Sequence, residues 1–324
     1  ALELITSAAE QKLPEAIKQL VNMYTNGDGV KFNRHKAFEW RKKLLSVNEE
    51  IYEQEKSCFT GLDYVLSCFE LANAYYEMDL FEDCIMTSLK LEYICDCVIN
   101  EVCCDEDDAF EIIRYAALAE MMLGQAYHAI DDLDSAAEHY RKSKLKLVSY
   151  VTKYDNPYAD RDLSLLYNKM AQLHKVRAEY DEALKHYDWA LVIQKENSKK
   201  QSDAEHLVVQ VLTLCNMSEI YRLIGDIKAS KEKVDEALKM MDEIVAVYGL
   251  PRHVALKMVV LMASAENYRM EGSVDKTLDV YAEVEKLEQV FIDNYEEVPE
   301  VIRAKRLAKM VNVYFMAARY DLVI

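Results

Sequence analysis

The chain has 324 residues and a formal net charge of −18, and 51% of its residues are hydrophobic, with only 7 glycines and 4 prolines. This acidic balance argues against a nucleic-acid-binding protein, because such proteins neutralise phosphates with Lys and Arg. No apolar run approaches the roughly 18 residues that a transmembrane helix needs, so we expect no membrane span. The scarcity of Gly and Pro favours nearly continuous helix.

The first 47 residues predict a helix–turn–helix unit. Apolar residues recur at helical spacing on both sides of Gly27 and Gly29, which suit a turn with positive φ. Asn33 is placed to cap the second helix. These residues, with Trp40, resemble the Sel1-like repeat, although Val21 and Asn33 stand where that family has Gly and Asp. The resemblance covers about residues 7 to 45 and implies a helical hairpin at 1–47 that caps or continues a repeat array.

A polar helical connector is expected at 48–56, and from about residue 65 the sequence repeats with a period of 47 residues. Each copy shows an apolar stripe, a polar break and a second apolar stripe, both stripes with helical spacing. The first stripe contains an aromatic column, which runs Tyr75, Tyr127, His174, Tyr221, Tyr268 and Tyr314. The second stripe contains a small-residue column, which runs Cys84, Ala136, Ala183, Ser230 and Thr277. Such helix pairs bury both stripes only by stacking on neighbours.

These columns resemble the tetratricopeptide repeat, and Leu123, Gly124, Tyr127, Ala136 and Tyr140 match its pattern closely in one copy. The copies exceed that family's usual length of about 34 residues, as in the long-helix variants of kinesin light chains and bacterial peptide receptors. The resemblance implies an all-α fold, a right-handed α-α superhelix of the tetratricopeptide-like solenoid type. We assign it to 48–324, with about six repeats whose first helices start near residues 65, 111, 158, 204, 252 and 299. The last repeat is incomplete at Ile324, so a missing C-terminal part is expected.

Proline and glycine mark the expected helix ends. Pro157 and Pro251 lie two periods apart, and Pro299 marks a further break; proline is tolerated in the first turn of a helix. Gly225 and Gly272 lie one period apart, where a first helix needs a left-handed residue to end. The acidic stretch 101–108 predicts a longer break, which accounts for one step of 52 residues.

The eight cysteines do not predict a disulfide scaffold. Cys68 and Cys84 fall on core positions, where a small thiol packs well. Four others cluster in the sequence: Cys95, Cys97, Cys103 and Cys104. Their spacing does not suit zinc, whose cysteine pairs usually have two to four intervening residues. We therefore expect packed or idle thiols and a reducing, cytoplasmic environment.

No motif in the chain points to catalysis. There is no Gly-rich phosphate loop, no HExxH, no G-x-S-x-G and no convincing metal-ligand spacing. His174 falls on the aromatic column and is expected to be packed, whereas His139 and His186 are expected on a solvated helix face. The sequence therefore predicts a protein that is not an enzyme and needs no cofactor or metal.

The resemblance implies that the first helices line a concave groove where ligands bind. Two columns of those helices can be followed along the sequence: Asn73, Gln125, Gln172, Glu219, Glu266 and Asn312, and Tyr76, His128, Lys175, Arg222, Arg269 and Phe315. Lys175, Arg222 and Arg269 form a basic stripe with the period of the repeat. The alternative is that Glu219–Arg222 and Glu266–Arg269 are ordinary i,i+3 pairs on helix surfaces.

Two classes of function remain open. The favoured one is a scaffold or adaptor that binds a peptide or partner segment, possibly acidic, in the groove. Its predicted site is Lys175, Arg222 and Arg269, with the side-chain amides of Asn168 and Asn216 holding the peptide backbone. The other class is the ligand-sensing regulatory region of a larger signalling or transcription-control protein, of the peptide-pheromone receptor type. The sequence does not identify the partner or the oligomeric state.

Overall fold

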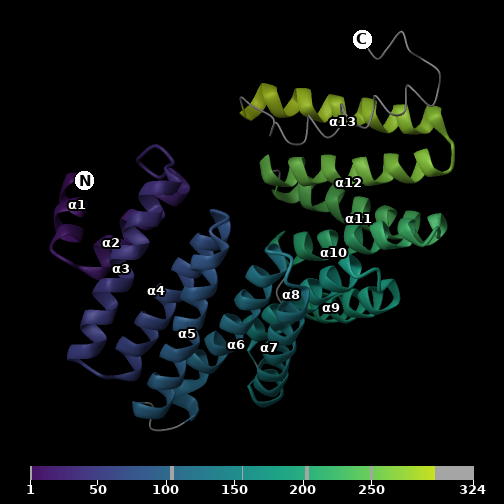
Figure 1. Ribbon diagram of the computed structural model, residues 1–324. Coiled ribbons are helices and arrows are strands. Elements are labelled where there is room, and N and C mark those ends of the chain that lie inside the picture. Colours follow the sequence, from purple (N-terminus) through teal and green to yellow (C-terminus); the bar gives the residue numbers. More distant parts are fainter. Residues whose placement is uncertain (1, 103–105, 155, 201–203, 249–250, 296–324) are drawn as a thin grey trace. The chain divides into compact units, whose positions relative to one another are not determined.

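The structure is a computed structural model that describes residues 2–102, 106–154, 156–200, 204–248 and 251–295 (Figure 1). These residues form thirteen helices and no strand. The helices are α1 (Leu2–Glu10), α2 (Pro14–Asn26), α3 (Arg34–Gln54), α4 (Cys58–Glu77), α5 (Phe81–Glu101), α6 (Glu106–Ala129), α7 (Leu133–Lys153), α8 (Pro157–Val176), α9 (Tyr180–Lys200), α10 (Ala204–Leu223), α11 (Ile227–Tyr248), α12 (Pro251–Met270) and α13 (Val274–Tyr295). The chain divides into two units, Ala1–Leu173 and His174–Ile324. The predicted last repeat, with Pro299, lies outside the described residues.

Helices α2 and α3 form the predicted N-terminal hairpin, and its turn has the predicted chemistry. Gly27 and Gly29 have φ values of 80° and 72°. The side chain of Asn33 caps α3 by accepting a hydrogen bond of 2.9 Å from the backbone N–H of Lys36. The expected polar connector is not a separate segment, because α3 continues through it to Gln54.

The repeats begin close to the predicted residues. Helices α8, α10 and α12 start within one residue of the predictions, and prolines open α8 and α12 as expected. The first two repeats start earlier, at Cys58 and Glu106 rather than near 65 and 111. For α4 the reason is local: Ser57 and Thr60 form a reciprocal capping box that begins the helix.

Consecutive helices pack on each other from α1 to α7 and from α9 to α13. First helices of successive repeats also touch, α4 with α6 in the first unit and α10 with α12 in the second. The small-residue column is fully buried in every copy: Cys84, Ala136, Ala183, Ser230 and Thr277. This confirms that the column lies in the core of each repeat, as a close contact between its helices requires.

A left-handed residue ends each first helix from α4 to α12, and only two of the five are glycine. The five residues and their φ values are Asp79 at 60°, Asp131 at 66°, Ala178 at 58°, Gly225 at 82° and Gly272 at 74°. In each repeat the next backbone N–H donates to the carbonyl of the aromatic column, over 2.8 to 3.0 Å. The same helix-ending turn therefore recurs at the period of the sequence.

The histidines are packed more tightly than predicted. His174 is partly buried as expected, with Nδ1 2.5 Å from a carboxylate oxygen of Glu179 and its ring 4.9 Å from that of His186. The prediction that His139 and His186 lie on a solvated face is wrong. His186 is only 5% exposed, and Nδ1 of His139 lies 2.7 Å from the buried carboxylate of Glu120. Both histidines stand on second helices and face the preceding first helix.

Of the six cysteines that the structure describes, five are free thiols and one is not. Cys68, Cys84 and Cys95 are buried and free, and Cys97 is partly exposed and free. Cys58 is disulfide-bonded, so the expectation of idle thiols throughout is wrong there. The predicted cluster members Cys103 and Cys104 lie outside the described residues.

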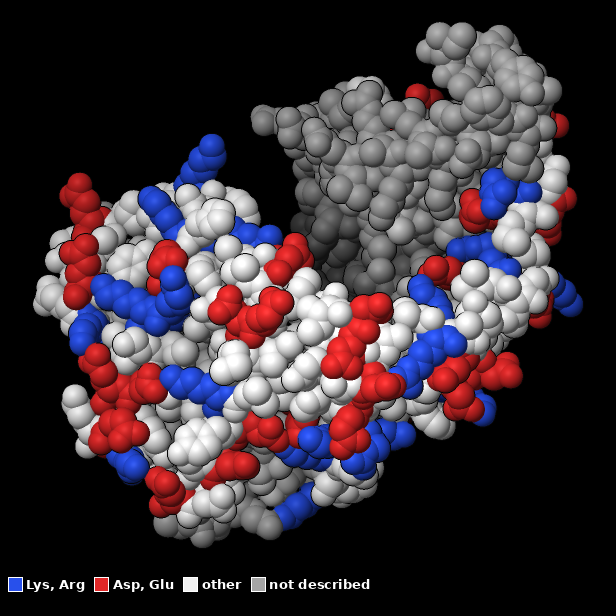
Figure 2. All heavy atoms as spheres, in the orientation of Figure 1, with Lys and Arg blue, Asp and Glu red and all other residues white. Residues whose placement is uncertain are grey.

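Charged side chains of both signs are mixed over the protein surface. Figure 2 shows Lys and Arg interspersed with Asp and Glu on the face in view. Many of them join neighbouring helices as ion pairs, such as Lys90 with Glu49 and Lys195 with Glu236, both at 2.9 Å. Among the described residues, no helix is both long enough and apolar enough to cross a membrane.

Candidate functional site

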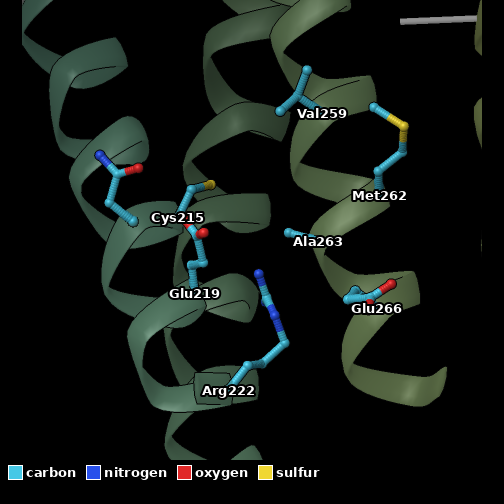
Figure 3. Close-up of a pocket in the computed structure, with 8 residues that line it drawn as sticks. Cys215, Glu219, Arg222, Val259, Met262, Ala263 and Glu266 are labelled. Atoms are coloured by element: carbon cyan, nitrogen blue, oxygen red, sulfur yellow. The ribbon is translucent and has the colours of Figure 1, made fainter. Parts of the chain in front are cut away.

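A pocket of about 480 Å³ lies between the first helices α10 and α12 of the second unit (Figure 3). Its lining residues are Cys215, Asn216, Glu219, Arg222, Val259, Met262, Ala263 and Glu266. They come largely from equivalent positions one period apart: Cys215 and Met262, Asn216 and Ala263, and Glu219 and Glu266. The α10–α12 pocket is therefore a product of the repeat, and it lies between first helices, the helices that the resemblance to the tetratricopeptide repeat implies for a binding groove.

Arg222 is the central cation of the α10–α12 pocket, and its side chain extends from α10 into the space between the two helices in Figure 3. One guanidinium nitrogen donates to Ser218 Oγ at 2.8 Å and to Asn267 Oδ1 at 3.2 Å. Ser230 Oγ closes this network by donating to Asn267 Oδ1 at 2.6 Å. Within the part of the chain that the structure describes, Arg222 forms no ion pair with a carboxylate.

The other two cations of the predicted stripe are paired. Lys175 Nζ lies 2.9 Å from a carboxylate oxygen of Glu219, across from α8 to α10. Arg269 donates through Nε to Glu266 at 2.9 Å, three residues earlier on α12. The alternative of simple i,i+3 pairs is therefore right for Arg269 and wrong for Arg222, because Glu219 turns to Lys175 instead.

The electrostatics follow from these contacts. Burial lowers the pKa of Arg222, against the opposing effect of the nearby carboxylates of Glu266 and Glu219. The hydrogen bond to Glu266 raises the pKa of Arg269. Arg222 is thus a partly desolvated cation whose hydrogen-bond partners are neutral. Burial also raises the pKa of Cys215 to about 12, so its thiol is not an activated nucleophile.

The two predicted amides are placed differently. Asn216 lines the α10–α12 pocket and makes no hydrogen bond to any residue that the structure describes. Asn168 lies in the first unit, is 9% exposed, and donates to the backbone carbonyl of Ser164 in its own helix. Asn168 also stands one period before Cys215, not before Asn216.

Sequence reasoning missed the apolar wall and one cation. Val259 and Met262 line the α10–α12 pocket. Val259 is 40% exposed, and Leu212, one period earlier, is 44% exposed. Apolar residues at equivalent positions of successive first helices are a sequence signal for such a wall, but these positions lie outside the two columns followed in the sequence. Lys169 stands one period before Asn216, and burial lowers its pKa; it has no ion pair among the described residues.

No family model and no curated protein matches the chain. Among solved structures, BtubC (BKLC) from P. vanneervenii superposes with a TM-score of 0.61 and 12% identity, over 82% of this chain and 94% of that one. The apo form of RapI gives a TM-score of 0.53 and 13% identity, over 89% and 88% of the two chains.

Aspartyl phosphate phosphatase F from Bacillus subtilis gives a TM-score of 0.51 and 13% identity, over 87% of this chain and 65% of that chain. Identities this low show the fold alone. The structural neighbours are tetratricopeptide-like repeat proteins, and the expected all-α architecture is confirmed. The chain therefore has the fold of a tetratricopeptide-repeat-like helical solenoid.

Proposed function

We propose that this chain is a non-catalytic protein-interaction module that binds an extended, acidic peptide segment of a partner in the α10–α12 pocket. The observation that carries the proposal is Arg222, a partly desolvated guanidinium that lines the pocket and has no carboxylate as a hydrogen-bond or ion-pair partner among the described residues. Glu219 and Glu266 line the same pocket but are paired with Lys175 and Arg269, and they do not fully offset the desolvation of Arg222, whose pKa is lowered on balance. A carboxylate from a ligand would supply the opposite charge and accept two parallel N–H donors.

The surroundings of Arg222 suit a peptide. Asn216 offers an amide donor and an amide acceptor, which match the carbonyl and N–H of an extended backbone. Val259 and Met262 provide an apolar wall for a neighbouring side chain. Lys175 and Arg269 flank the pocket and offset part of the charge of Glu219 and Glu266. Asn168 stays a prediction from the sequence and is not needed for this arrangement.

The net charge of −18 favours selectivity. An acidic surface repels acidic chains at long range, and attraction is limited to the places where a cation is exposed or unpaired. Binding should therefore depend on where the acidic residues lie along the peptide rather than on the overall charge of the peptide. It should weaken as salt screens the contact.

The proposal is tested by probing the full chain on an array of extended peptides that carry Asp or Glu, each beside its Asn or Gln counterpart. Binders are then measured in solution by fluorescence anisotropy. Loss of one partner of a buried, hydrogen-bonded charge pair costs at least about 2 kcal/mol, so Arg222→Gln should weaken binding about thirtyfold. Lys228→Gln removes the same charge from an exposed site on α11, away from the pocket, and should have little effect.

Charge reversal at both Arg222 and Arg269 should abolish binding of the acidic peptides. The fold of each variant is checked by circular dichroism. Unchanged affinity in the double variant, with its helical content intact, would move the binding site to the convex face or the repeat edges. Equal binding of the acidic peptides and their amide counterparts would remove the role given to Arg222.

A further inference from the structure

The first unit contains a second pocket, of about 210 Å³, between α3, α4 and α5. We call it the tyrosine pocket, and its lining residues are Glu49, Tyr52, Glu53, Lys56, Tyr64, Lys90, Tyr93, Ile94, Cys97 and Glu101. It belongs to a different unit from the α10–α12 pocket and is independent of the function proposed above. Its volume lies below the roughly 300 to 1,000 Å³ of typical small-molecule sites and suits a single side chain.

Three tyrosines and three glutamates surround this space, a combination that favours a cation. The rings of Tyr52 and Tyr64 lie 5.8 Å apart at an angle of 31°, and Tyr93 stands at the rim with 68% of its surface exposed. Aromatic faces attract cations through their quadrupole. The glutamates add three negative charges against two lysines, so the pocket carries a net negative charge.

The two lysines of the protein already use these features. Lys90 Nζ lies 2.9 Å from a carboxylate oxygen of Glu49 and 5.5 Å from the ring centroid of Tyr64. Lys56 Nζ lies 3.1 Å from a carboxylate oxygen of Glu101 and 5.8 Å from the ring centroid of Tyr52. Both contacts show that the carboxylates and aromatic rings of the pocket walls bind ammonium groups.

Two polar groups in the pocket are left over. Tyr52 is only 3% exposed, and its hydroxyl is buried without a hydrogen-bond partner in the described part of the chain. A buried polar group without a partner costs about 1–3 kcal/mol, so this hydroxyl calls for a ligand. Glu53 is an exposed residue, and its carboxylate makes no hydrogen bond or ion pair with any described residue, so it is available to a ligand.

We propose that the tyrosine pocket binds the side chain of an arginine presented by a partner protein. The guanidinium has five N–H donors and a planar face, whereas the leftover groups are a carboxylate and a hydroxyl oxygen. Glu53 and the Tyr52 hydroxyl accept hydrogen bonds, and the exposed ring of Tyr93 stacks on the guanidinium plane. The protein's own lysines keep Glu49 and Glu101, so no existing ion pair has to break.

The probe is N-acetyl-arginine amide, with N-acetyl-citrulline amide as its uncharged isostere. Cys97 lines the tyrosine pocket as a partly exposed free thiol, so occupancy is measured as slower alkylation by iodoacetamide, localised by mass spectrometry of the full chain. The arginine probe at millimolar concentrations should protect Cys97 saturably, and the citrulline probe should not. Free N-acetyl-cysteine amide in the same reaction serves as the control for a direct effect of the probe on the reagent, and it should react at an unchanged rate.

Variants then separate the site from general electrostatics. Glu53→Gln should weaken protection about tenfold, because a hydrogen bond to a charged group is lost. Glu55→Gln makes the same charge change at the end of the same helix, outside the pocket, and should have little effect. Tyr52→Phe should weaken protection about threefold without lowering the melting temperature, since it removes an unpartnered hydroxyl and keeps the ring.

Four results would overturn the proposal. The first is the absence of saturable protection at Cys97, and the second is equal protection by the citrulline probe. The third is an equal loss of protection in Glu53→Gln and Glu55→Gln. The fourth is protection by N-acetyl-aspartate amide instead, which would make the lysines the binding groups. None of these outcomes bears on peptide binding at Arg222.

Discussion

The close contact between α6 and α7 predicts a measurable penalty for a single added methyl group. Gly124 lies in α6, and a Cβ atom built there would lie 2.5 Å from both Cδ1 and Cε1 of Tyr140. Tyr140 is 0% exposed, so its ring has no solvent-filled space into which it can turn. Gly124→Ala therefore overpacks the helix contact.

Two effects of opposite sign set the magnitude. Alanine is favoured over glycine in a helix interior by about 1 kcal/mol, which would stabilise α6. Overpacking a well-packed core costs about 1–3 kcal/mol. The added Cβ would meet two ring atoms of the fully buried Tyr140, so the cost should lie near the upper end of this range. The net expectation is a loss of about 2 kcal/mol in the free energy of unfolding of the first unit.

Urea denaturation measures this loss, together with hydrogen exchange in peptides from α6 and α7. Exchange is needed because a chain of two units need not unfold in one transition. The double variant Gly124→Ala/Tyr140→Leu is the control, and it should cost less than the sum of the single variants because the clash is gone. Ala265 and Tyr281 stand three periods after Gly124 and Tyr140, and both are fully buried in one core cluster, so that repeat accommodates an alanine at the position of Gly124. A Gly124→Ala variant as stable as the parent would mean that the helix contact at Tyr140 can adjust in the same way, and the expected clash would be absent.

Three further predictions concern stability. Ala183→Leu should lower the free energy of unfolding by about 1–3 kcal/mol, seen as a lower melting temperature, because Ala183 is fully buried at the close helix contact. Asp162→Asn should cost about 2 kcal/mol in urea denaturation, since it removes the carboxylate 2.6 Å from the poorly exposed guanidinium of Arg114; an unchanged midpoint would show that Glu111 suffices. Burial opposes ionisation of Glu49, but hydrogen bonds from Tyr64 and a lysine outweigh it and lower the pKa of Glu49. Its stabilising contribution is complete above the ordinary carboxyl pKa and is lost as pH falls through the lower folded value, so Glu49→Gln should flatten the acid side of a stability–pH curve.

Local signals explain why most helix ends could be predicted. Pro157 and Pro251 open helices, Gly225 and Gly272 close them, and Asn33 caps one, because each acts through its own backbone or the next few residues. The aspartates and the alanine that adopt the same left-handed turn were not predicted. They can do so because the backbone hydrogen bond and the packing of the following helix hold a conformation that these residues do not favour alone.

Burial of the second-helix histidines could not be judged from neighbouring residues. His139 adjoins the core residue Tyr140 in the sequence, and this position next to a core column favours a solvated helix face. Its partner Glu120 lies 19 residues earlier on another helix, and only the packing of α6 on α7 brings the two together. The buried ring then stacks on Tyr127 with centroids 5.2 Å apart.

The sequence by itself determined the period, the small-residue column and the stacking of helix pairs, since apolar spacing decides which face of each helix must be buried. It also located the basic stripe on the last turns of the first helices. Only the tertiary structure decided how those charges pair. Glu219 is three residues from Arg222 yet binds Lys175 of the preceding repeat, and Arg222 turns to Asn267 of the next. Long side chains on adjacent helices have several partners within reach, and the separation and rotation of the packed backbones select among them.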